Sequence, residues 1–323
     1  MSAENAQLFY EGGQSATAMS ALTNSGDATT YTSAASLWSQ RAGFAPTVRP
    51  DGLISGGTLS ATATNNQVAV TALSCNLAGV VTAVEAGNVT ITRPSTNVSK
   101  VVSITVTSAG ALAAVLGTDG ATVAFSETRG AAGGPPLIPV GSIEIGQVRV
   151  TTSAAAVVTA AQLFAVPGLH VERADGPLFD INYAAGSVVF QSALPSIHAG
   201  TVPKGVYASY SAPIFAAVAK ATDFVMPETS YSVTSTQIYG GNIGSTSSTL
   251  NQGSFTAFLN DGVTDPLVTL KGQNLWFKFF PDRYKTPYTL CQGKLGITRS
   301  FPAGDEIQAS CTISAASAGV EVG

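Results

Sequence analysis

The residues of this chain that could do chemistry are few, and two pairs of acids near its C-terminal end come closest to a known pattern. Asp261 and Asp265 lie in the segment NDGVTDP, and Asp305 and Glu306 follow a Pro/Gly turn. Such carboxylates could offer oxygen ligands to calcium or form the acidic pair of a polysaccharide-cleaving enzyme. The further acids of an EF-hand loop are absent. We therefore expect turn residues here and no metal site.

Other catalytic patterns are missing. His170 and His198 have no partner at a ligand spacing and are expected to be a loop or strand-edge histidine each. The sequence contains no H-E-x-x-H, paired C-x-x-C, G-x-S-x-G or Walker-type motif. The segment GGNIG at 240–244 superficially resembles a phosphate-binding loop but lacks the full spacing and a following helix. These observations predict a protein without catalysis and without a cofactor.

The cysteines and the first residues of the sequence indicate the cellular compartment in which the protein is made. Cys75, Cys291 and Cys311 are odd in number and have no paired spacing, which favours reduced, buried thiols. The first residues lack the basic and apolar regions of a signal peptide, and no segment approaches 18 uninterrupted apolar residues. We expect synthesis in the cytoplasm and no membrane insertion.

The composition predicts a mainly β protein that associates. Of the 323 residues, 45% are hydrophobic and only 11% are charged, against about 25% in a typical soluble domain. Thr and Val are abundant, and both prefer strands. Residues 1–165 carry 6 Lys/Arg and 8 Asp/Glu and residues 166–323 carry 9 and 11, so each half has a net charge of −2. This balance argues against a basic nucleic-acid-binding domain. So little charge protects a monomer poorly against association, and burial in an assembly is the favoured alternative.

Turn residues and composition divide the chain into three parts. Residues 1–52 are predicted to be an irregular N-terminal arm with one helical turn near Trp38. Residues 53–165 show short strands at regular spacing, which is typical of a sandwich or barrel, and form a β-rich accessory module, Ig-like or decoration-like. Residues 166–323 begin a second series of strands and form the main β-sandwich or barrel domain.

Within the third part, two segments break the strand pattern. PIFAAVAKATDF, residues 213–224, could be a short helix. The segment 240–254 is rich in Gly, Ser, Thr and Asn, is almost uncharged and reads as a long loop. Loops of this length are often functional, so we predict that it orders only against a neighbouring subunit.

The same part supplies the candidate assembly residues. On a strand, Trp276, Lys278 and Phe280 would share one face, which needs cover from another element or subunit. Basic residues with interleaved tyrosines could hold nucleic acid, but acids lie among them and salt bridges between subunits are favoured. The candidate assembly residues are Gly240, Asn242, Asn251, Trp276, Phe280, Arg283, Arg299, Asp305 and Glu306.

A resemblance points in the same direction. Residues 267–317 contain the hairpin GKLGITRSFPAGDEI, with two alternating runs around a Pro/Gly turn, and FDINYAAGSVVF and GTVPKGVYASYSA precede it. Over residues 166–323 this pattern resembles the tail tube (major tail) proteins of bacteriophages with long non-contractile tails. The block at 53–152 departs from that pattern.

The resemblance implies a structural role in a virion. Subunits would form hexameric rings stacked into a hollow tube through which double-stranded DNA passes without specific binding. The partners would be further copies of the chain and the tape measure, tail terminator and tail tip proteins. The alternatives are a head-decoration or host-attachment protein using the accessory module, and a polysaccharide-cleaving tail enzyme, which would need a carboxylate pair with perturbed pKa values in a cleft.

Overall fold

The structure is a computed structural model that describes residues 3–323. The chain divides into two units. The first comprises the residues up to Thr17, Leu37–Ala45 and Tyr210–Gly323, and the second comprises Ala18–Ser36 and Pro46–Ser209. The boundary expected at 165/166 therefore lies inside the second unit, and the expected N-terminal arm is shared between the two.

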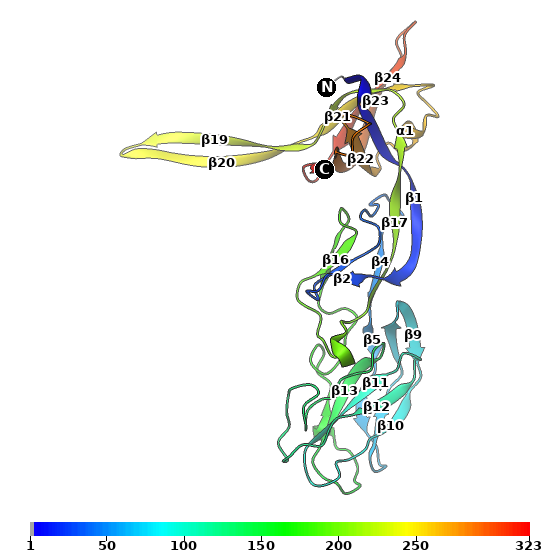
Figure 1. Cartoon of the computed structure of the whole chain (residues 1–323), viewed down its shortest axis with the longest axis vertical. Helices are drawn as coiled ribbons and strands as arrows, with labels where there is room; N and C mark the ends of the chain where they lie inside the picture. The colour runs from blue at the N-terminus through cyan, green and yellow to red at the C-terminus, as the bar shows by residue number, and fades with distance from the viewer. Residues whose placement is uncertain (1–2) are drawn as a thin grey trace. The chain divides into compact units, whose positions relative to one another are not determined.

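The first unit is built on an antiparallel sheet (Figure 1). Its strands, in spatial order, are β18 (Ala221–Val225), β21 (Gly253–Leu259), β24 (Ile307–Ser314), β23 (Tyr288–Ser300), β22 (Asn274–Phe280), β1 (Gln7–Ala21) and β17 (Val206–Ala217), with β25 (Val320–Val322) paired to β23. Alternate residues of these strands, among them Phe255, Phe277 and Leu295, meet in one apolar core. The first residues of β17 belong to the second unit, where they pair with β4 (Thr47–Pro50).

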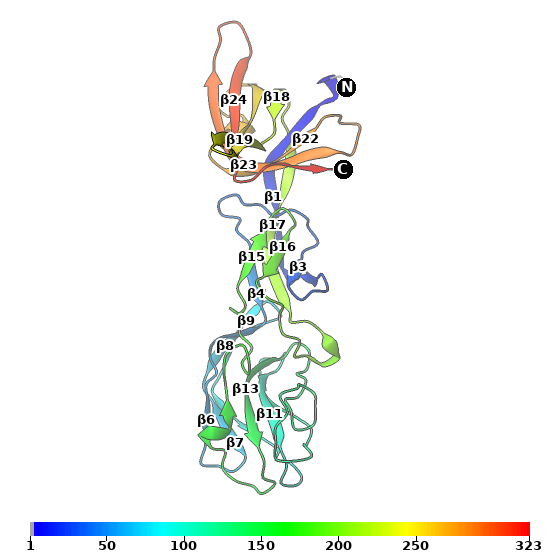
Figure 2. The ribbon, with the colours of Figure 1, turned by 90° about the vertical axis from the view of Figure 1, so that its left-hand side faces the viewer.

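The hairpin predicted near the C-terminal end is confirmed. Strands β23 and β24 run side by side and are joined by the turn at 301–306 (Figure 2), with Leu295 opposite Ile313 and Ile297 opposite Cys311. These four side chains are buried on one face, as the alternation predicts.

Strand β22 is covered on both faces by its own chain. Leu275 and Phe277 lie in the core, and Trp276 on the opposite face is also buried. The Trp276 indole donates a hydrogen bond of 2.9 Å to the carbonyl oxygen of Trp38, whose ring stacks on Tyr210. The cover predicted for this face comes from another element of the same chain, because residues 37–45 pack over Trp276 and no second subunit is needed there.

Three local predictions are wrong. The arm holds β1, β2 (Thr23–Asn24), β3 (Thr30–Thr32) and β4 instead of irregular chain, and no helical turn forms near Trp38. The segment 213–224 supplies the end of β17 and most of β18 instead of a helix. For the arm strands and for β17 and β18, pairing with other strands overrides the local preference, whereas residues 33–40 form neither helix nor strand. The helices that form are short: η1 (Ala3–Asn5), η2 (Ala160–Gln162), η3 (Ala199–Thr201) and α1 (Pro266–Thr269).

The second unit contains several small antiparallel sheets. A common core takes Val68, Cys75, Ile104 and Val148 from three of them. One three-stranded sheet has the order β10 (Gly87–Thr90), β7 (Gln67–Val70), β6 (Leu59–Ala61), and another has the order β5 (Gly52–Gly56), β8 (Leu73–Leu77), β9 (Val80–Val84). A four-stranded sheet has the order β12 (Leu112–Leu116), β11 (Lys100–Val106), β13 (Ile143–Val150), β14 (Leu163–Phe164). In the last sheet β15 (Phe179–Asn182) and β16 (Ser187–Phe190) are followed by β3 and β2.

A long connection buries the second face of strand β11. Between β12 and β13 the chain runs beside β11, with hydrogen bonds of 2.8 Å from Gly117 to Val101 and 2.7 Å from Ser99 to Thr122, and its Arg129 guanidinium lies over that face on the Glu144 carboxylate beside Ser103. Every residue of β11 is consequently buried, including polar Ser103. This cover creates the environment of the charged cluster described below.

The predicted fold class is confirmed: the chain is mainly β, with several antiparallel sheets. The barrel alternative is not confirmed, because no sheet formed by residues 3–323 closes on itself. In the described part of the chain no helix has the length and apolar character needed to cross a bilayer. The three cysteines are buried free thiols.

Candidate functional site

The most unusual feature of the first unit is a long, exposed hairpin. Strands β19 (Glu228–Ile238) and β20 (Gly241–Asn251) pair over their full length of 11 residues each (Figure 1, yellow). At about 3.3 Å per residue the hairpin is about 35 Å long. The prediction of a long loop over 240–254 is therefore wrong, because most of this segment forms strand β20.

The hairpin has no cover on either face or edge among the described residues. Its two strands form a sheet of their own, and all of its residues are exposed except Thr229 and Leu250, which are half-buried. Tyr231 and Val233 are 77% and 72% exposed, and Glu228 is the one charged residue in the two strands. A lone two-stranded hairpin is marginally stable in water, and uncharged free edges invite pairing with another chain.

Three of the candidate assembly residues lie on this hairpin. Gly240 sits in its turn with a φ of +91°, a conformation that favours glycine, and Asn242 and Asn251 pair with Gln237 and Glu228. All three are exposed. The structure thus brings together the candidates that sequence reasoning placed in one segment.

The other candidates have partners inside the first unit. Phe280, at the end of strand β22, packs against Phe9 of β1 and Tyr288 of β23. The two arginines donate hydrogen bonds, Arg299 to the carbonyl oxygen of Gly262 and Arg283 to the hydroxyl of Tyr284. Of the two acids, the Glu306 carboxylate forms an ion pair with Lys220, and the Asp305 carboxylate accepts a hydrogen bond from the amide of Glu306. These contacts supply a local role for each charge without a second subunit.

The acids considered as calcium ligands serve as turn and cap residues. The Asp261 carboxylate accepts hydrogen bonds from the Thr264 hydroxyl and from the amides of Val263 and Thr264, and these bonds lower its pKa. Asp265 caps the short helix α1 by accepting from the amide of Leu267. In the described residues, no three His, Cys, Asp or Glu side chains are grouped as metal ligands.

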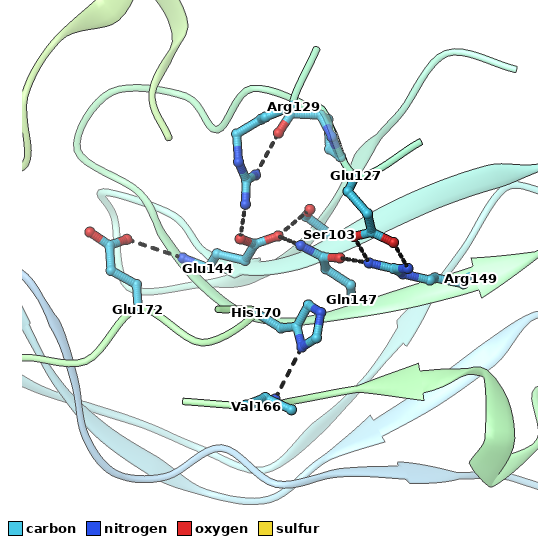
Figure 3. Close-up of polar contacts among 10 residues, drawn as sticks. Ser103, Glu127, Arg129, Glu144, Gln147, Arg149, Val166, His170 and Glu172 are labelled. Carbon is cyan, nitrogen blue, oxygen red and sulfur yellow. Dashed lines mark hydrogen bonds and ion pairs between the residues drawn. The ribbon is translucent and has the colours of Figure 1, made fainter. Parts of the chain in front are cut away.

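A cluster of buried charges occupies the second unit, and sequence reasoning missed it. Glu144, near the start of β13, is 2% exposed. Its carboxylate accepts hydrogen bonds from the Arg129 guanidinium, the Ser103 hydroxyl and the Gln147 amide (Figure 3). Burial raises its pKa, and the Arg129 charge acts in the opposite direction.

A second buried acid, Glu172, lies beside the first. Its amide donates to the carbonyl oxygen of Glu144 at 2.8 Å, and the Glu144 amide lies 3.4 Å from its Oε2. Its cation is Lys204, whose Nζ is 3.8 Å from Oε1 and donates a hydrogen bond of 2.6 Å to the carbonyl oxygen of Arg173. Burial raises the pKa of Glu172 to about 7 and that of nearby Asp51 to about 6, while Lys204 lowers both.

The raised pKa of Glu172 predicts that the second unit loses stability as the pH rises. In the unfolded chain the carboxyl loses its proton near pH 4, but in the folded unit it keeps it to about pH 7. Its contribution is therefore complete below pH 4 and is lost between pH 4 and 7. We expect Glu172→Gln, which stays neutral, to gain up to about 3 kcal/mol relative to the parent over that interval.

Hydrogen exchange of peptides from β11 and β13 would measure this effect. Both tryptophans belong to the first unit, so their fluorescence follows that unit and serves as an internal control. Glu127→Gln is the matched variant, because Glu127 is exposed and pairs with Arg149. Equal pH profiles for the parent and Glu172→Gln would contradict the assignment.

The sequence held one weak signal for this cluster. His170 and Glu172 are two residues apart, and both are buried in the second unit. His170 Nδ1 accepts from the amide of Val166 at 3.3 Å, and burial together with the Arg149 charge lowers its pKa. His198, also buried, has a pKa lowered by burial.

The two histidines thus occupy structural positions.

No protein-family model, no curated protein and no solved structure matches this chain.

Proposed function

We propose that this chain is a structural virion protein that assembles with copies of itself into stacked rings, as the tail tube of a long-tailed bacteriophage. The observation that carries the proposal is the exposed β19–β20 hairpin. The resemblance of residues 166–323 to tail tube proteins is the reason for proposing stacked rings as the form of the assembly. In this role the chain has no substrate.

The physical argument is that the hairpin lacks what stabilises a hairpin in a monomer. Its apolar side chains remain exposed in the isolated subunit; they are Tyr231, Val233, Ile238 and Ile243. A neighbouring copy would cover them and pair with the free edges, and a head-to-tail contact of this kind closes into rings or continues as a tube. The low charge of the chain limits repulsion between copies, and its net charge of −4 disfavours retention of passing DNA.

Negative-stain electron microscopy of the purified chain over a series of protein and salt concentrations tests the proposal. Rings or hollow tubes with a central channel are the expected result. Uniform small particles at every concentration would overturn it and favour the head-decoration or attachment alternative. Release of reducing sugar ends from a polysaccharide would instead support the enzyme.

A further inference from the structure

The pair of Lys204 and Glu172 in the second unit is buried more completely than any other ion pair among the described residues. The two side chains are 1% and 3% exposed, whereas each other ion pair within residues 3–323 has at least one side chain that is 16% exposed or more. Two charges at such depth are costly, and a change that removes both of them is favoured.

The amine and the carboxyl of this pair face each other without a direct hydrogen bond. Lys204 Nζ lies 3.8 Å from Glu172 Oε1, which is longer than a hydrogen bond, and it donates instead to the carbonyl oxygen of Arg173 at 2.6 Å. Oε1 is buried and accepts no hydrogen bond. Oε2 lies 3.4 Å from the amide nitrogen of Glu144 (Figure 3). The surrounding chain therefore holds an amine close to a carboxyl group that is not satisfied by it.

The environment favours the uncharged form of both groups. Burial raises the pKa of Glu172 to about 7, and the charges of Asp51 and Glu144 add to this effect, while Lys204 opposes it. Burial lowers the pKa of the Lys204 amine, against the charges of the nearby acids. An uncharged amine has a free electron pair and is a nucleophile. A protonated carboxyl group can lose its hydroxyl as water, which a carboxylate cannot.

We propose from this geometry that Lys204 and Glu172 react with each other and form an isopeptide bond between Nζ and Cδ. The electron pair of Nζ attacks Cδ, and the electrons of the C=O bond move onto Oε2, where the amide of Glu144 stabilises the developing negative charge. The intermediate then expels Oε1, which carries the carboxyl proton and takes a second proton from Nζ. The products are an amide and one water molecule, so the step balances without an oxidant or a co-reactant.

A second lysine pair in the same unit lacks these conditions and serves as a comparison. Lys100 Nζ lies 2.9 Å from Asp119 Oδ1, in direct contact, and the Asp119 side chain is 28% exposed. Asp119 also accepts hydrogen bonds from the amide and the hydroxyl of Ser95, which hold its pKa well below the usual range. An ionised carboxylate does not lose a hydroxyl, so we expect no bond between Lys100 and Asp119.

The bond lies inside the second unit and does not depend on assembly through the hairpin. It closes residues 172–204 into a loop, which restricts the unfolded chain as a disulfide does. The pH effect predicted above for Glu172 then belongs to molecules in which the bond has not formed, because the bonded residue has no carboxyl group to titrate. The mass of the molecule separates the two populations.

Mass spectrometry of the purified full chain, denatured before the measurement, tests the proposal. We expect a mass lower than that of the sequence by one water molecule. An Asp-Gly pair such as Asp175-Gly176 also loses water when it forms a succinimide, so the bond has to be located. Trypsin cannot cut at a bonded Lys204, and we expect residues 150–173 linked to residues 174–220. Residues 150–173 and 174–204 found only as separate peptides would overturn the proposal.

Two variants make the test specific. Lys204→Met removes the amine, and we expect this variant to have the full mass and no linked peptide. Lys100→Met removes the lysine of the comparison pair and should keep both the loss of water and the linked peptide. An equal loss of water in a folded Lys204→Met would contradict the proposal. If Lys204→Met does not fold, the peptide map of the parent decides, because it needs no variant.

Discussion

Shortening the β19–β20 hairpin will leave a folded subunit that forms no rings or tubes. In the variant, residues 230–249 are replaced by Asn-Gly, so that Thr229 and Leu250, which are partners in the hairpin, flank a two-residue turn. The hairpin has no cover inside the subunit, so its removal costs the first unit little. It removes the surface through which we propose that copies associate.

Electron microscopy and sedimentation velocity would measure the result. Tryptophan fluorescence reports the fold of the variant, because Trp38 and Trp276 are buried in the first unit. A finer pair of variants separates the hairpin from a general loss of apolar surface. Tyr231→Thr with Val233→Thr should weaken assembly, while Val80→Thr with Val81→Thr, which are also exposed apolar residues but lie in the second unit, should not. Tubes formed by the shortened variant would refute the role of the hairpin.

The largest loss of stability is expected from Arg129→Met. This substitution removes the cation of Glu144 and leaves a buried carboxylate with only Ser103 and Gln147 as partners. Breaking a buried ion pair by removal of one partner costs about 3–5 kcal/mol. We expect the second unit to lose stability of this order, seen as faster hydrogen exchange in β11 and β13.

Two companion variants establish the cause. Arg129→Met with Glu144→Gln removes both charges and should recover part of the loss, which a double-mutant cycle would quantify. Arg173→Met breaks the exposed pair with Asp175 and should cost less than about 1 kcal/mol. Similar losses for Arg129→Met and Arg173→Met would show that the buried carboxylate is not the reason.

The parts of the fold that sequence predicted are those in which local pattern and tertiary position agree. In the two runs on either side of 301–306 apolar residues alternate with polar ones, and each strand has one buried and one exposed face, so their hairpin was predictable. The same holds for FDINYAAGSVVF, whose strands β15 and β16 pair around Ala185-Gly186. Strand β20 was not predictable, because Gly, Ser and Asn are poor strand formers and its regularity comes from the partner strand.

The charged cluster was beyond the reach of sequence for a different reason. Glu144, Glu172 and Lys204 are far apart in the chain, and their burial depends on the connection that folds over β11. Nothing in the residue types distinguishes Glu144 from an exposed acid such as Glu127. By contrast, the expectation that copies of the chain associate rests on its low charge, which is visible in the composition.

The pairing of β1 has a consequence for synthesis on the ribosome. Leu8 pairs with Phe279, roughly 270 residues later in the chain, so the first strand has no β22 partner until most of the polypeptide has been made. At about 5–20 residues per second that interval lasts about 15–50 s. The second unit is complete by Ser209 and can fold during this time, whereas the first unit closes last. A chain still attached to its ribosome therefore has no finished first unit, so the association that we propose would begin only when translation is nearly over.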